Sequence, residues 1–453
     1  MGTIERLLKG TIFCLMLVFI LLVSTTYTID IRFQSATVGW LSACRVLLLF
    51  AAAAYLFTVR DRLRATIDGV TIVLVTIIAA GAGAGLLGAA SWSDYFHGAF
   101  QYAFMLAFYL IGRDTPRSGI DRRQLRAASI AALSGYAIAA VLYALTPGLH
   151  SGAYSFQPNL ALLPLAGGWG TPVSAAAGML ILIGNKRAVF LGAAFIIAAL
   201  SVREFERRRG TFGDAVRIAA TLALAPAIAA AATIALLSAQ LPLVSTVSAR
   251  FSTAPSFVNT VNTDAKVLAA GPTEASPASG TGTLTQVTGS VANPSPLSPT
   301  TPNVAAEARI DPMVRLTGAR NVEVTAVWRE ISATSTRLLF GAGLGAGFDV
   351  DYISPNDYQP VHFRRDQADL MPAHIALTSG APLAIAFSVA LFAIFSRVFL
   401  QLGKLDRIDR TLALFALGLS LDVLLGFAAT NPIIWSAIGY VSTLAVRPAR
   451  AQR

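Results

Sequence analysis

Charged residues are scarce in this sequence. They make up 13% of its 453 residues, against about 25% in a typical soluble domain, whereas 55% of the residues are hydrophobic. The mean hydropathy is correspondingly high, at +0.63. A soluble protein of this length would expose too much apolar surface to water, so the composition excludes a soluble class and indicates a membrane protein.

Cysteine is almost absent, and no common cofactor motif is present. Cys14 and Cys44 both fall in apolar runs, which excludes a disulfide framework and a thiolate metal site. The glycines from Gly341 to Gly347 lack the preceding strand and following helix of a dinucleotide-binding unit. Asp349 and Asp351 are more readily explained as solvated loop carboxylates than as metal ligands. We therefore expect neither a cofactor nor a metal.

Long apolar runs are abundant. A helix needs about 20 mostly apolar residues to cross a bilayer, and the segments that we predict as crossings are 10–29, 39–59, 67–90, 96–112, 126–146, 188–202, 216–239, 376–396, 411–428 and 432–446. Glycine and proline between Gly167 and Pro172 divide a further stretch, 158–184, into either a re-entrant hairpin or a pair of helices. The predicted fold class is an all-α polytopic membrane protein of about 10–12 transmembrane helices.

The net charge of +11 indicates topology and not nucleic-acid binding, because the basic residues cluster in short loops between the apolar runs. Placing these clusters in the cytoplasm puts both termini there as well. Arg6 and Lys9 precede the apolar run Thr11–Val23, but no cleavage pattern follows, so this run is predicted to be the first transmembrane helix. The predicted division is a helix bundle at 1–242, a long outer loop at 243–372, and C-terminal transmembrane helices at 373–453.

The long outer loop has two halves. Residues 245–306 are rich in Ser, Thr, Pro, Ala and Gly, a composition expected to be flexible. Residues 310–370 are expected to be partly helical, since Val324, Val327, Trp328 and Ile331 recur at the spacing of an amphipathic helix. The polar stretch 349–369 is predicted to be a loop.

All four histidines fall on the outer side in this topology. Imidazole is the side chain best suited to proton transfer near neutral pH. His374, at the mouth of the membrane domain, and His362 are the candidate catalytic bases. His97 and His150 are interpreted as loop or interfacial histidines without a role.

Outer-face cations form a second group of candidates. Guanidinium groups donate paired, charged hydrogen bonds to phosphate oxygens, which suits them to pyrophosphate. The candidate substrate-binding residues are Lys186, Arg187, Arg320, Arg364, Arg365 and Arg45, the last within the second predicted helix. Two alternatives stay open: Arg45 forms an ion pair with Asp422, and Arg364 and Arg365 are merely solvated.

The second half of the chain resembles the bacterial O-antigen ligase and O-antigen polymerase family. The resemblance covers roughly 184–396 and rests on the basic motif Gly184-Asn185-Lys186-Arg187-Ala188, then Arg320 and Trp328, then the run Leu339 to Gly345 leading to His374 and Gly380. It implies a glycosyltransferase-C-like enzyme that needs no metal. It would transfer an undecaprenyl-diphosphate-linked oligosaccharide to an acceptor glycan or lipid-linked sugar at the periplasmic face of the bacterial inner membrane.

The resemblance also implies residue roles and partners. Arg187 would bind the donor pyrophosphate, Arg320 would supply a second cation, and His374 would activate the acceptor hydroxyl. The partners would be the lipid-linked donor, the acceptor, membrane lipid, and chain-length regulators or export proteins, with no nucleic acid. Two departures keep His362 open as the base: Ile375 stands where relatives often carry a polar residue, and the gap from His374 to Gly380 is short.

Other functions also fit the membrane body. A transporter or flippase of lipid-linked glycans would show discontinuous helices in matching halves and ionisable residues near the midplane. Asp422 and the break at 167–172 are hints of this kind, although no internal repeat accompanies them. A non-catalytic assembly subunit would lack the Arg and His cluster.

Overall fold

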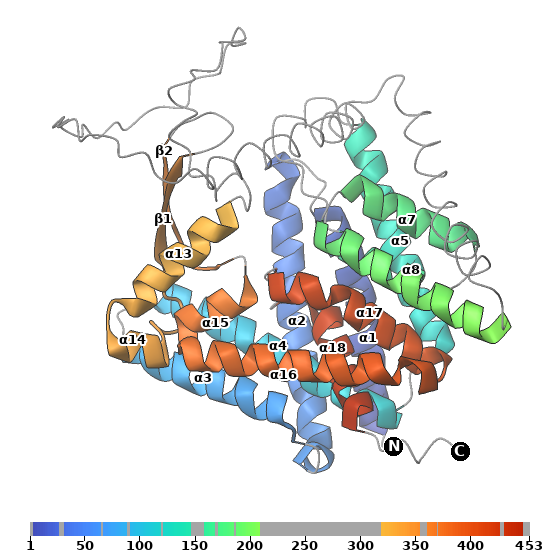
Figure 1. The fold of residues 1–453 in the computed structure, drawn as a ribbon, viewed down its shortest axis with the longest axis horizontal. Helices are drawn as coiled ribbons and strands as arrows, with labels where there is room; N and C mark the ends of the chain where they lie inside the picture. The colour runs from blue at the N-terminus through green and yellow to red at the C-terminus, as the bar shows by residue number, and fades with distance from the viewer. Residues whose placement is uncertain are drawn as a thin grey trace, which may run out of the picture.

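The computed structural model describes residues 3–26, 31–64, 67–87, 91–118, 121–145, 158–167, 171–184, 187–208, 319–353, 360–368, 370–425 and 430–446. These residues are mostly helical (Figure 1). The helices before the long loop are α1 (Thr3–Thr26), α2 (Ile31–Arg64), α3 (Gly69–Leu87), α4 (Trp92–Ser118), α5 (Arg122–Leu145), η1 (Pro158–Ala161), α6 (Leu162–Gly167), α7 (Thr171–Gly184) and α8 (Arg187–Arg208). Those after it are α13 (Ala319–Ser332), α14 (Ser335–Phe340), α15 (Met371–Ser379), α16 (Ala381–Gln401), η2 (Leu402–Lys404), α17 (Arg407–Leu425) and α18 (Pro432–Val446).

Four helices among the described residues are long and apolar enough to cross a membrane. Their spans are Thr3–Val23, Trp40–Arg64, Gly69–Leu87 and Ala381–Lys404. Only 22–33% of each apolar window is buried inside the protein, and large side chains such as Phe50, Phe57 and Phe392 point outward. Apolar surface that faces outward along whole helices is expected where lipid is the solvent. The chain is therefore a mostly helical membrane protein.

Small residues let the helices approach closely. A Cβ atom at Gly439 of α18 would lie 2.0 Å from the carbonyl oxygen of Tyr109 in α4, and one at Gly192 of α8 would lie 2.1 Å from that of Gly418 in α17. Close backbone approach at glycine is typical of helix pairs in membranes. Helices α3 and α16 run side by side, and α2 crosses their direction (Figure 1), so the candidate spans do not form a simple parallel bundle.

Several predicted helices are confirmed, and α18 has the predicted bounds. The stretch 158–184 is divided as expected, with α6 ending at Gly167 and α7 beginning at Thr171. The predicted start of the 376–396 helix is wrong, because Gly380 separates α15 from α16. The predicted helix 216–239 and the stretch 245–306, which the sequence predicts to be flexible, lie outside the described residues.

The prediction that 349–369 is a loop is wrong. Strands β1 (Phe348–Ile353) and β2 (Pro360–Arg365) form an antiparallel hairpin in which Asp349 faces Arg364 and Asp351 faces His362. The physical reason is a period of two, since Phe348 and Val350 are buried while the two aspartates between and after them are exposed. This hairpin lies with α13 and α14 at one side of the helical body (Figure 1). The described fold is thus mostly, but not entirely, helical.

The amphipathic helix is confirmed as α13, with one error in its faces. Val327 and Ile331 are buried as predicted, but Trp328 is 56% exposed. Glu323 is only 2% exposed, and it forms an ion pair with Arg365 of β2. The buried face of α13 thus includes a carboxylate that is paired with another element.

Candidate functional site

The glycine-rich run from Gly341 to Gly347 forms a buried loop among α3, α4 and α15. The backbone nitrogens of Ala342 and Gly343 donate to the carbonyl oxygens of Leu377 and Thr378, at 2.6 and 3.2 Å. Leu344 donates its backbone N–H to the carbonyl oxygen of Gly81 in α3, at 2.9 Å. The loop thereby satisfies carbonyl groups at the end of α15 that have no partner within that helix.

Glycine is required at two points of this arrangement. Gly343 has a φ of 101°, and a Cβ atom there would lie 2.3 Å from the backbone nitrogen of Gly85. Gly380 has a φ of 94°, and its Cβ would lie 2.1 Å from the carbonyl oxygen of Leu339. These conformations are open chiefly to glycine. The run is therefore a packing element that fixes α15 against α3, and not a nucleotide-binding turn.

His374 lies at the centre of this arrangement. Its side chain is 2% exposed, and its ring stacks on Tyr102 of α4 with 5.8 Å between ring centroids and 11° between planes. The Tyr102 hydroxyl lies 2.7 Å from Oγ1 of Thr378, which donates to the carbonyl oxygen of His374 at 3.0 Å. Tyr102 thus contacts the His374 ring directly and is linked to the His374 backbone through Thr378.

The protonation state of His374 follows from this burial. Desolvation, with a smaller contribution from the nearby His97, lowers the pKa of His374 to about 3. The imidazole is neutral at pH 7 as a result. A neutral imidazole can accept a proton, but a pKa this far below 7 makes it a weak base in the structure without substrate.

His97, at the start of α4, is the exposed neighbour of this buried site. The side-chain amide nitrogens of Gln101 and Gln367 each lie 2.9 Å from its Nε2 atom. With both amides donating, Nε2 accepts and Nδ1 carries the proton. Gln101 is buried, whereas His97 is exposed.

The hairpin carries His362, Arg364 and Arg365, each opposite a carboxylate. Arg365 pairs with buried Glu323, and His362 pairs with Asp351, whose hydrogen bond and charge raise the pKa of His362. Arg364 Nη1 lies 3.8 Å from Oδ1 of Asp349, and both side chains are exposed. Of the three, Arg364 is the least constrained for binding an anion, since its ion pair is long and solvated.

The other predicted residues are less closely defined. Arg187 is the first residue of α8 and Arg320 is the second of α13, but their side chains lie outside the described part, as do Lys186 and His150. Arg45 is half-buried, with its guanidinium carbon 5.9 Å from the centre of the Phe19 ring. The predicted alternative partner of Arg45, Asp422, has no described side chain, so that ion pair stays a prediction.

Sequence reasoning missed the contribution of α4. Tyr102 and Gln101 were not singled out, and His97 was assigned no role, yet they lie around His374. The spacing of His97 and Gln101, four residues apart on one helix face, was the available signal. The contacts of His97 with Gln367 and of Tyr102 with Thr378 join residues far apart in the sequence, so the local spacing could not predict them.

The described residues contain no group of three or more His, Cys, Asp or Glu side chains that could hold a metal ion. No protein-family model, curated protein or solved structure matches this chain. The chemistry that the site offers therefore has to be argued from its own residues: a neutral buried imidazole, an exposed histidine beside it, and cationic side chains on an adjoining hairpin.

Proposed function

We propose that this chain is a metal-independent membrane glycosyltransferase. It transfers an undecaprenyl-diphosphate-linked oligosaccharide to an acceptor glycan or lipid-linked sugar, in the polymerisation or ligation of a surface polysaccharide such as O-antigen or exopolysaccharide. The proposal includes about 10–12 transmembrane helices of glycosyltransferase-C-like arrangement in the bacterial inner membrane. Both termini are cytoplasmic, and the long loop and the site are periplasmic.

One observation carries this proposal: chemistry-bearing residues from distant parts of the chain meet at one place. Nε2 of His97 in α4 lies 2.9 Å from the side-chain amide nitrogen of Gln367, two residues beyond Arg365 of the hairpin, and His97 is near His374 of α15. Proton-accepting and anion-binding groups are therefore close together. Together with the family resemblance of 184–396, this favours group transfer from a lipid diphosphate.

The proposed reaction needs a base and cations. The acceptor hydroxyl oxygen forms a bond to the anomeric carbon of the donor sugar, while the bond from that carbon to the diphosphate oxygen breaks. The hydroxyl proton passes to an imidazole, His374 in the first instance, with His362 as the alternative. Arg187, Arg320 and Arg364 stabilise the negative charge that grows on the leaving undecaprenyl diphosphate, which takes the place of a metal ion.

A flippase of lipid-linked glycans is the second candidate function. The break between α15 and α16 at Gly380 favours it, because discontinuous helices are typical of transporter binding sites. The resemblance of 184–396 to a family of glycan ligases and polymerases favours the transferase, since a flippase forms no glycosidic bond.

A deletion strain distinguishes the two functions. For a transferase, we expect lipid-linked repeat units to accumulate on the outer leaflet while long polymer or capped lipopolysaccharide disappears. Accumulation on the inner leaflet would identify a flippase instead. Restoration of polymer by a plasmid copy, under matched expression, is the control for effects on neighbouring genes.

A further inference from the structure

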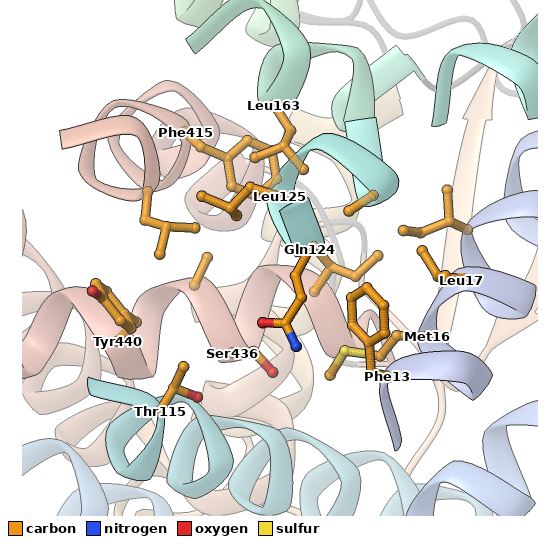
Figure 2. A pocket seen from close by; sticks show the side chains of 15 residues that line it. Phe13, Met16, Leu17, Thr115, Gln124, Leu125, Leu163, Phe415, Ser436 and Tyr440 are labelled. Atoms are coloured by element: carbon orange, nitrogen blue, oxygen red, sulfur yellow. The ribbon is translucent and has the colours of Figure 1, made fainter. Parts of the chain in front are cut away.

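A cavity of about 130 Å³ lies away from His374. It is lined by α1, α4, α5, α6, α17 and α18, and its walls are almost entirely apolar (Figure 2). Thr115 of α4 lines it, and the 13 residues that separate Thr115 from Tyr102 correspond to about 20 Å of helix. The cavity is therefore separate from the candidate active site.

The apolar walls of the cavity and its position beside a candidate membrane span suit a lipid chain. Phe13, Met16 and Leu17 of α1 line it, and they belong to the candidate membrane span Thr3–Val23. The cavity is partly open and not sealed, and this apolar span forms one of its walls. Cavities of this volume accommodate small apolar groups, so this one has room for a segment of an acyl chain.

One side of the cavity is bordered by positive charge. Gln124 and Leu125 of α5 and Leu412 of α17 line it, and both helices begin nearby. The exposed cations at these two helix starts are Arg122, Arg123, Arg126, Lys404 and Arg407, against two exposed carboxylates, Asp121 and Asp406. Both carboxylates accept hydrogen bonds from backbone N–H groups of their own helix starts. The rim is thus net positive.

We infer that this cavity is a binding site for an anionic phospholipid of the surrounding bilayer. One acyl chain enters the apolar space, and the phosphate lies against Arg123, Arg126 and Arg407. Basic side chains beside a space between transmembrane helices are the arrangement that recognises anionic headgroups. Gln124, which extends toward Ser436 (Figure 2), lies between the chain and the headgroup and offers an amide to the ester region. This inference does not depend on the transferase activity.

Lipid binding to the purified full-length protein tests the inference. The delipidated protein in detergent is mixed with phosphatidylglycerol or with phosphatidylcholine of the same chains, and bound lipid is counted by native mass spectrometry. We expect the first phosphatidylglycerol to bind more tightly than phosphatidylcholine. Removing three cations in R123Q/R126Q/R407Q should weaken phosphatidylglycerol binding about a hundredfold and leave phosphatidylcholine unchanged.

A pair of alanines tests the cavity itself. Ala128 lines the cavity and the neighbouring Ala127 does not. Ala128→Phe should abolish tight binding of the first phosphatidylglycerol, and Ala127→Phe should retain it. Equal binding of the two lipids by the wild type, or unchanged binding by Ala128→Phe, would overturn the inference. Should Ala128→Phe fail to fold, R123Q/R126Q/R407Q is the deciding variant, because its substitutions are at exposed side chains. Unchanged phosphatidylglycerol binding by that variant would also overturn the inference.

Discussion

At the scale of single residues, His374 is a titratable side chain that is buried in the folded protein. Its folded pKa of about 3 lies below the ordinary value of 6.5. Between these two pH values the unfolded chain binds a proton at this position and the folded chain does not. The free energy of unfolding therefore falls as the pH falls through this range. His362 has the opposite sign, since its pKa is raised by Asp351.

The pH dependence of stability gives the first prediction. Between pH 6 and pH 4, the contribution of His374 to the free energy of unfolding should decrease by about 1.4 kcal/mol per pH unit. His374→Phe, which retains a ring to stack on Tyr102, should lose this component. Thermal unfolding in detergent across the pH range measures it. Identical pH profiles for the wild type and the variant would show that His374 is not buried as described.

Gly343 gives the second prediction. Gly343→Ala adds a Cβ atom at a positive φ and within 2.3 Å of the Gly85 nitrogen, so we expect a loss of at least about 1–3 kcal/mol of stability. Gly403→Ala is the matched control, because a Cβ atom there meets nothing within 4 Å. Melting temperatures of the two purified variants are compared. Equal melting temperatures would contradict the packing role of the glycine loop.

At the scale of elements, the hairpin is attached to α13 by apolar packing of Phe348 and Val350 against Val327 and by the ion pair between Arg365 and Glu323. Glu323 is buried, whereas Arg365 retains 31% of its side-chain exposure. Removing the arginine leaves a carboxylate in a poorly hydrated position, which costs about 1–3 kcal/mol. The exposed pair of Arg364 and Asp349 contributes less than about 1 kcal/mol.

These two arginines, one residue apart, form the third prediction. Arg365→Ala should speed hydrogen exchange in α13 and the hairpin about tenfold, while Arg364→Ala should change it little. Hydrogen exchange with mass spectrometry reads both segments. A larger effect from Arg364→Ala would mean that the hairpin is held by contacts other than the Glu323 pair.

How far the sequence predicts these elements depends on the range of the interactions involved. The apolar run of α18 and the spacing of Val327 and Ile331 in α13 are local signals, and both predictions are confirmed. The hairpin was missed because the alternation of Phe348 and Val350 with aspartates is short and lies in a polar segment. The site around His374 was only partly predicted, since its contact with Tyr102 joins residues far apart in the chain.

At the scale of the whole molecule, topology gives the fourth prediction. The proposal puts the long loop in the periplasm, so a reporter that is active only in the periplasm should be active when inserted near residue 280. The same reporter after residue 64, at the end of α2, should be inactive, because the basic residues Arg60, Arg62 and Arg64 predict a cytoplasmic position for that end. The reverse pattern would place the candidate site on the wrong side for a periplasmic transferase.

Reconstitution tests most directly whether the protein joins glycans and releases the lipid diphosphate of the donor. Purified protein in liposomes is given an undecaprenyl-diphosphate-linked oligosaccharide and an acceptor, and glycan length and released undecaprenyl diphosphate are measured. We predict longer glycans with stoichiometric release, reduced about 10²–10⁴-fold in His374→Ala and little changed in His362→Ala. Movement of the donor across the bilayer without any new glycosidic bond would contradict the claim.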